Sequence, residues 1–278
     1  MMALFDETSY KCSKLITQQY STSFTLGIKT LDKKFHYPIY GIYGFVRFAD
    51  EIVDTFHEHN KADLLDDFES CTYEAIQKRI SLNPVLHSFQ AVVHQYKIDS
   101  TYIDAFLKSM RMDLLEQRYN KDLYDEYIYG SAEVVGLMCL RVFCEGDEAL
   151  FEKLKAPARS LGAAFQKVNF LRDMKSDYKE RGRVYFPKID FASFDNNCKA
   201  AIEQDIQNDF DQAYEGILQL PRSARMGVYL AYIYYLKLFR KIQLLPAARI
   251  LSERVRVPDN TKLALLVGSY LRYRFNTI

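Results

Sequence analysis

The amino-acid sequence predicts an all-α fold, and three observations support this prediction. Its 278 residues include only 11 Gly and 7 Pro, whereas architectures built from strands and tight turns use more of both. Apolar residues, which make up 49 % of the chain, recur with the spacing of helices. No repeat, linker or low-complexity tract interrupts this pattern, so we predict one helical domain that spans residues 1–278.

The first half of the chain divides into helices at a few polar or helix-breaking positions. A break is expected between Gly27 and Pro38, and the polar stretch that begins at His57 ends the next helix. Asn83 followed by Pro84 ends another. The predicted helices span residues 8–28, 39–57, 62–80, 84–95 and 99–118.

The second half continues the helical series. Residues 122–144 are predicted to form a helix that ends near Gly146, and Pro157 is expected to separate a short helix from a long one within residues 147–178. Gly182 and Pro187 bound a loop. The last predicted helices span residues 195–219, 222–244 and 259–273.

Charge and cysteine content exclude several classes of protein. A net charge of +1 gives no basic surface for nucleic acid. The five cysteines show no zinc-binding spacing, which is typical of reduced thiols in the cytoplasm. The sequence shows neither a signal peptide nor about 18 consecutive apolar residues. We therefore expect a cytoplasmic protein whose only membrane contact is peripheral, for product release.

Aromatic residues are abundant, with 21 Tyr and 19 Phe but no Trp. They have two readings: packing in an ordinary core, or the lining of a deep apolar cavity whose ring faces also steady a cation. Composition alone favours the first reading.

Two predicted helices each carry a pair of aspartates four residues apart. Asp50 and Asp54 form the first pair, and Asp173 and Asp177 form the second. Residues at this spacing lie on one helix face, where their like charges repel unless a cation lies between them. Magnesium suits such a site because it takes oxygen ligands and bridges carboxylates to phosphates. A single pair of this kind is also common on a solvated helix face.

The neighbours of both pairs favour a metal site over a solvated face. The first pair follows an apolar and aromatic segment that contains Arg47, on approximately the same helix face. The second helix carries one polar stripe in an otherwise apolar segment: Gln166, Asn169, Asp173 and Asp177. Burying these groups without partners would be costly, and a metal cluster that holds a diphosphate would supply the partners.

These residues resemble the squalene/phytoene synthase family, in which two aspartate-rich helices face each other across a cavity. The similarity covers nearly the whole chain, from Ser21 to Pro258. Further matching segments between these residues are 112–114, 127–136 and 182–187. The resemblance implies a class I isoprenoid synthase, which is a single-domain helical bundle around a central apolar cavity.

The resemblance also implies a role for each matching residue. The magnesium ligands, with manganese as an alternative metal, would be Asp50, Asp54, Asn169, Asp173 and Asp177. The groups that bind diphosphate oxygens would be Ser21, Ser23, Arg47, Gln166 and Arg254. Tyr129 and Tyr235 would lie near the leaving diphosphate, and Arg183 and Tyr185 match a loop that closes over the metal site. Without the resemblance, Arg47 and Arg254 read equally well as surface ion pairs, and Tyr129 as core packing.

One residue departs from the family pattern. Relatives usually carry a small residue where Glu133 stands. Three placements stay open for its side chain: facing away from the cavity, pairing with a basic residue, or changing the polar end of the pocket.

The implied reaction begins with ionisation of an allylic diphosphate in a dry pocket, where metal ions and basic residues neutralise the departing group. Two geranylgeranyl diphosphates would condense head to head through a cyclopropyl diphosphate to give phytoene, the first step of carotenoid biosynthesis. A GxGxxG fingerprint is absent, so no NADPH is expected.

Two other functions stay open. A squalene or dehydrosqualene synthase would use farnesyl diphosphate in the same chemistry, because side chains at the pocket floor set the chain length. The alternative of another class is a non-catalytic assembly protein of the same fold, and the two complete aspartate pairs count against it. Chain-elongating synthases usually carry a DDxxD motif, and Asp66-Asp67 reads as a solvated surface instead.

Overall fold

The computed structural model describes residues 2–115, 118–187, 194–275 and 278. Over these residues the secondary structure is helical apart from one isolated bridge between Arg118 and Val184, so the predicted all-α fold is confirmed. The helices are α1 (Met2–Tyr20), α2 (Thr22–Lys29), α3 (Lys33–Asp54), α4 (Lys61–Lys78), α5 (Pro84–Tyr96), α6 (Ser100–Leu115), α7 (Lys121–Ile128), α8 (Val134–Cys144), α9 (Glu148–Arg181), α10 (Asn196–Ile217), α11 (Arg222–Gln243), α12 (Ala247–Ile250) and α13 (Asp259–Arg274). A π-helical turn, Tyr129–Glu133, joins α7 to α8.

The predicted boundaries are wrong near the N-terminus. Residues 8–28 do not form one helix, because Ser21 is extended and its side chain accepts a hydrogen bond from the Phe24 amide at 3.2 Å, which caps α2. The break expected up to Pro38 is also shorter than predicted. Asp32 caps α3 by accepting from the Lys34 amide at 3.1 Å, and Pro38 lies in the second turn of α3, where it removes one backbone hydrogen bond.

Pro157 does not separate two helices, as the sequence predicted, because α9 runs unbroken from Glu148 to Arg181. Packing against α10 explains the difference. A Cβ atom added to Gly216 of α10 would lie 2.2 Å from Cβ of Pro157, so the two helices meet closely at the proline. Tertiary packing of this kind overrides the local preference of proline for a helix end.

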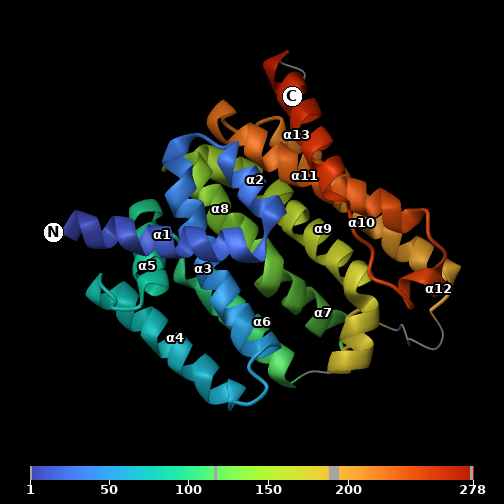
Figure 1. Cartoon of the computed structure of the whole chain (residues 1–278), viewed down its shortest axis with the longest axis horizontal. Coiled ribbons are helices and arrows are strands. Elements are labelled where there is room, and N and C mark those ends of the chain that lie inside the picture. Colours follow the sequence, from blue (N-terminus) through green and yellow to red (C-terminus); the bar gives the residue numbers. More distant parts are fainter. Residues whose placement is uncertain (1, 116–117, 188–193, 276–277) are drawn as a thin grey trace.

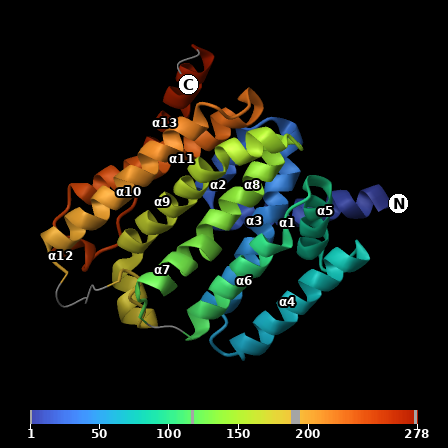
Figure 2. The same ribbon diagram turned by 180° about the vertical axis from the view of Figure 1, so that it is seen from behind.

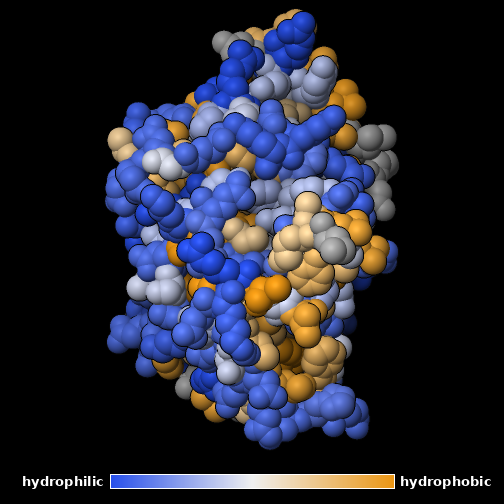
Figure 3. Space-filling model, turned by 90° about the vertical axis from the view of Figure 1, so that its left-hand side faces the viewer, coloured by the Kyte–Doolittle hydropathy of each residue, from blue (hydrophilic) through white to orange (hydrophobic). Residues whose placement is uncertain are grey.

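The helices are arranged with α3, α6, α8 and α9 in the middle of the molecule (Figures 1 and 2). Helix α1 packs on α3 and α5, and α4 lies on the same side. On the opposite side α10 packs on α9, while α11 contacts α2 and α13. Hydrophilic residues cover most of the face around the N-terminal helices, and hydrophobic residues gather on one part of it (Figure 3).

The π turn is fixed between two neighbouring helices by close backbone contacts. A Cβ atom at Gly130 would lie 2.3 Å from the carbonyl oxygen of Ala105 on α6, and one at Gly162 of α9 would lie 2.6 Å from that of Ala132. Only glycine allows these approaches. The turn changes the helical phase between α7 and α8, which decides which side chains of this segment face inward.

One segment of the described residues, Lys121–Cys144, has the length and hydropathy of a membrane span, although none was predicted from the sequence. It includes α7, the π turn and α8, which pack against α3, α6 and α9. Of the apolar 18-residue window within this segment, 56 % is buried inside the bundle. Such burial is typical of a core helix, so the segment is weak evidence for membrane insertion.

Candidate active site

A cavity of about 870 Å³ lies between the central helices. Its lining on α3 changes from Ile39 and Ile42 to Asp50 and Asp54 toward the C-terminus of the helix. The lining on α9 changes in the same way, from Leu154, Leu161 and Phe165 to Asn169, Asp173 and Asp177. The cavity therefore has one polar end, which the C-terminal halves of α3 and α9 line, and an apolar remainder.

Some aromatic residues pack in the core, and others line the cavity. Phe45 and Phe89 stack in the core with their ring centroids 3.9 Å apart. Phe24, Tyr43 and Phe165 instead line the cavity. These three rings therefore form part of the wall that a ligand in the cavity would contact.

The carboxylate of Asp50 is incompletely neutralised at the polar end. Burial raises the pKa of Asp50 to about 7, while nearby Arg47 lowers it and Asp54 and Asp113 raise it further. Arg47 lies 3.9 Å from Asp50 (Nη1 to Oδ2) but forms its closest ion pair with Glu51. Its Nε is buried and has no hydrogen-bond partner among the described residues. A bound anion would supply that partner, and a bound cation would stabilise the charged form of Asp50.

Asp173 on α9 is in a different electrostatic state, because two arginines contact it. Arg172 Nε lies 3.1 Å from both carboxylate oxygens. Arg254, from the segment after α12, brings its Nε to 2.7 Å of Oδ1. The structure thus brings together Asp173 and Arg254, which are 81 residues apart in the sequence.

Gln166, Asn169 and Tyr235 also line the cavity. The Tyr235 hydroxyl donates a hydrogen bond to Oδ1 of Asn169 at 3.3 Å. Its ring stacks on Phe165 with a centroid distance of 3.9 Å. Tyr235 therefore lies at the boundary between the polar stripe of α9 and the apolar wall.

The loop after α9 returns to the cavity because of its first residue. Gly182 has a φ of 68°, the left-handed conformation that ends helices, and its amide hydrogen bonds close the last turn. The amide of Arg183 then donates to the carbonyl of Asp177 at 2.9 Å. This turn places the Arg183 guanidinium inside the site, with Nη1 at 3.3 Å from Oδ1 of both Asp54 and Asp113.

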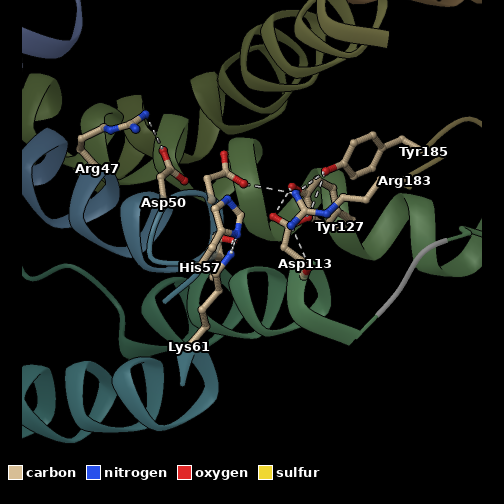
Figure 4. A network of polar contacts seen from close by, with 10 residues as sticks. Arg47, Asp50, His57, Lys61, Asp113, Tyr127, Arg183 and Tyr185 are labelled. Carbon is tan, nitrogen blue, oxygen red and sulfur yellow. Dashed lines mark hydrogen bonds and ion pairs between the residues drawn. The ribbon is translucent and has the colours of Figure 1, made fainter. Parts of the chain in front are cut away.

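Asp113 of α6 forms the centre of a buried polar network (Figure 4). It accepts hydrogen bonds from the hydroxyls of Tyr127 at 2.7 Å and Tyr185 at 3.0 Å, and its backbone carbonyl accepts from Arg183 at 2.8 Å. Burial raises the pKa of Asp113 to about 6, partly offset by the charge of Arg183. Neither Asp113 nor Tyr127 was assigned a role from the sequence. The available signal was the short matching segment 112–114 and the position of this acid among apolar residues.

Three predicted site residues do not line the cavity. Ser21 caps α2, and Ser23 is half-buried, whereas Phe24 of α2 does line it. Tyr129 was expected at the reaction centre, but the π turn directs its ring toward Arg159, whose guanidinium lies 5.2 Å from the ring centroid. Tyr127 and Ser131, on either side of Tyr129 in the sequence, line the cavity instead of Tyr129.

Glu133 pairs with a basic residue, which was one of the three placements left open. Its carboxylate oxygen Oε2 lies 2.5 Å from Nε of Arg159, and it is absent from the cavity lining. The ion pair joins the π turn to α9. Glu133 therefore does not change the polar end of the cavity.

The donor set at the polar end fits hard divalent cations. Carboxylate and amide oxygens are the ligands that magnesium prefers, and it commonly keeps waters and shares phosphate oxygens. Within residues 2–115, 118–187, 194–275 and 278, no three carboxylate, histidine or cysteine side chains lie close enough together to hold one ion. A divalent ion held by these residues would therefore complete its coordination with other oxygen ligands, such as waters or the oxygens of a diphosphate.

A family model described as squalene/phytoene synthase matches residues 17–261. The chain belongs to this family of prenyl-transferring enzymes. Its relatives include a phytoene synthase of Arthrospira platensis, 28 % identical over 96 % of this chain and 94 % of that protein. A 15-cis-phytoene synthase of Synechococcus elongatus is 29 % identical over 95 % and 93 % of the two chains.

Solved structures support the family fold. A dehydrosqualene synthase in complex with a ligand superposes with a TM-score of 0.81, at 24 % identity over 96 % of this chain and 98 % of that chain. A squalene synthase from Alicyclobacillus acidocaldarius superposes with a TM-score of 0.75, at 18 % identity over 86 % and 94 %. At these identities the likeness shows the fold of the family.

Proposed function

We propose that this member of the squalene/phytoene synthase family condenses two geranylgeranyl diphosphates head to head to phytoene, through a cyclopropyl diphosphate intermediate and with magnesium as the metal. The observation that carries the proposal is the cavity itself, because two carboxylate-bearing helices line one polar end of an otherwise apolar chamber. Relatives named phytoene synthase, matched over nearly their full length, support this choice of reaction.

Asp50 and Asp54 on α3, with Asn169, Asp173 and Asp177 on α9, are the residues that would hold magnesium. The bound ions supply positive charge against the departing diphosphate. Arg47 and Arg254 bind diphosphate oxygens directly, since both line the polar end and the buried Nε of Arg47 has no hydrogen-bond partner within the part of the chain that the structure describes.

The arginines have a second task in the proposed cycle. In the structure Arg183 contacts Asp54, Arg254 contacts Asp173, and Arg47 approaches Asp50. Arg183 and Arg254 therefore each neutralise a carboxylate that a metal ion would otherwise neutralise. Cations held by these carboxylates would release both guanidinium groups to bind diphosphate, and this exchange would couple the binding of metal and substrate.

The rest of the cavity excludes water from the reacting chains. Its walls carry Ile42, Val135, Leu140, Phe143 and Ile217, among other apolar side chains. In such surroundings the electrostatic attraction between cationic groups and diphosphate is much stronger than in water. An allylic cation formed there meets a double bond of the second chain rather than solvent.

A second candidate is a dehydrosqualene synthase that uses farnesyl diphosphate. The structural match to a dehydrosqualene synthase along 96 % of this chain favours it. Both candidates use the same polar end, and they differ in the length of chain that the apolar part admits. The longer substrate agrees with the names of the relatives found by sequence.

The direct test is to incubate the purified protein with each prenyl diphosphate and magnesium, with and without NADPH, and to analyse the extracted lipids by chromatography. We expect phytoene from geranylgeranyl diphosphate without NADPH, and no product in EDTA. A product formed only from farnesyl diphosphate would favour the second candidate. Absence of product from either substrate would favour a non-catalytic protein of this fold.

A further inference from the structure

Helix α13 presents an apolar stripe to solvent. The stripe consists of Ala264, Val267, Gly268, Leu271 and, directly after the helix, Phe275, all of which are exposed. Successive helical residues are about 100° apart around the axis, so all five fall within about 60° of one direction. The helices of a soluble protein normally turn polar residues outward. The outward stripe of α13 does the opposite.

Basic and aromatic residues surround this stripe. Arg272 and Arg274 are exposed and lie about 80° to either side of its centre line. Tyr270 is 56 % exposed and lies beyond Arg274, more than about 100° from the centre line. Residues 260–278 contain three basic residues and no acidic one. An exposed apolar stripe between cationic margins is typical of helices that lie in a membrane interface.

Helix α13 lies on the outer side of α2 and α11, which form one wall of the cavity, and its apolar stripe faces solvent. Helix α13 packs on α11 at the outer edge of the molecule (Figures 1 and 2). Lys262 Nζ donates to the Thr22 hydroxyl of α2 at 3.1 Å, and Arg272 Nη1 donates to the Tyr229 hydroxyl of α11 at 3.2 Å. Gly27 of α2 and Gly227 of α11 both line the cavity. These contacts fix the orientation of the stripe relative to the cavity.

We propose that α13 docks on an anionic lipid surface, with its apolar stripe in the bilayer interface and its arginines against lipid phosphates. The charge of the helix is complementary to such a surface. A second copy of the chain fits less well, because two α13 helices would bring like charges together without acidic partners on the stripe. Docking in this way turns the α2–α11 wall toward the membrane. Lipid binding by this stripe does not require the reaction proposed for the cavity.

The test is co-sedimentation of the full chain with vesicles of phosphatidylcholine, with and without phosphatidylglycerol. A triple variant, Val267→Ser, Leu271→Ser and Phe275→Ser, is expected to bind anionic vesicles at least about tenfold more weakly. Arg274→Gln alone is expected to bind about fivefold more weakly. Added salt should weaken binding by the wild type.

The matched control removes equally exposed apolar residues elsewhere. Leu82 and Leu244 are 91 % and 85 % exposed, and replacing both with Ser should leave vesicle binding unchanged. The chain contains no Trp, so Leu271→Trp supplies a single fluorescent probe. Its emission should shift to the blue on anionic vesicles, whereas that of Leu82→Trp should not.

Three results would overturn the proposal. The first is equal vesicle binding by the wild type, the triple variant and Arg274→Gln. The second is a Leu271→Trp emission that anionic vesicles leave unchanged. The third is a dimer of the wild type that the triple variant converts to a monomer, without vesicle binding by either, because the stripe would then bind a second copy. Arg274→Gln and Leu271→Trp change single exposed residues, so these readouts survive if the triple variant does not fold.

Discussion

The two aspartate pairs look alike in the sequence, yet the structure gives them different electrostatic states. On α3, burial raises the pKa of Asp50 to about 7, and the charge of Arg47, which pairs mainly with Glu51, offsets this rise only in part. On α9, Asp173 contacts both Arg172 and Arg254. The same spacing of carboxylates therefore includes one under-neutralised carboxylate, Asp50, and one saturated carboxylate, Asp173. We infer that Asp50 gains more from a cation, whereas Asp173 must first exchange its arginines.

Removing either carboxylate should have the largest effect. Asp50→Ala and Asp173→Ala are each expected to lower kcat/KM by about 100- to 1000-fold, the scale seen when a group that stabilises developing charge is lost. The two should differ in substrate binding, since Asp173→Ala leaves two arginines free for diphosphate and Asp50→Ala frees none. Steady-state kinetics at saturating magnesium measure this. Equal increases in KM for both variants would contradict the difference we describe.

Arg183→Gln should separate metal binding from catalysis. Loss of its charge from beside Asp54 is expected to tighten Mn²⁺ binding about fivefold without substrate, while kcat/KM falls about tenfold or more. Electron paramagnetic resonance of free Mn²⁺ measures the first effect. Arg111→Gln is the matched control, because Arg111 pairs with Asp66 and Glu69 away from the cavity. Weaker Mn²⁺ binding by Arg183→Gln would show that the arginine does not compete with the metal.

The raised pKa of Asp50 predicts how stability without metal depends on pH. The folded state binds a proton that the unfolded state has released between the ordinary pKa of 3.8 and about 7, so stability should fall as pH rises through this window. Magnesium should reverse the trend, because it binds the ionised carboxylate.

Thermal unfolding of Asp50→Asn checks this prediction. The variant should gain about 1 kcal/mol near neutral pH without metal, a value reduced to allow for the partial exposure of Asp50 to the cavity. Asp173→Asn should instead lose stability, since it leaves two arginines without their carboxylate. A loss of stability in both variants would remove the contrast between the pairs.

The smallest effect is expected at Glu133. Because its ion pair with Arg159 is partly exposed and lies away from the cavity, Glu133→Gln should lower stability by about 0.5 kcal/mol and change kcat/KM less than about twofold. Denaturant unfolding and steady-state kinetics measure the two quantities. A large loss of activity would place Glu133 in the active site.

The all-α fold was predictable because the helical pattern of apolar residues is strong and turn residues are scarce. Boundaries were less predictable where tertiary contacts decide them. Pro157 stays within α9 because α10 packs against it at Gly216, and the sequence carries no local sign of that contact.

The site was predictable where its residues lie on one helix face, as in the stripe from Gln166 to Asp177. It was not predictable where helical phase or long-range contacts decide. The π turn moves Tyr129 off the cavity and leaves Tyr127 on it. Asp113 is linked to the site by its contact with Arg183, which lies 70 residues later in the chain. No local sequence pattern predicts such a long-range contact.

The most direct test of the central claim is a crystal structure with Mn²⁺ and inorganic diphosphate, with anomalous scattering used to locate the metal. We predict Mn²⁺ between the diphosphate and the carboxylates of α3 and α9, with Arg183 released from Asp54 and Arg254 from Asp173. Diphosphate bound in the cavity without Mn²⁺, or Mn²⁺ found only outside it, would contradict the account.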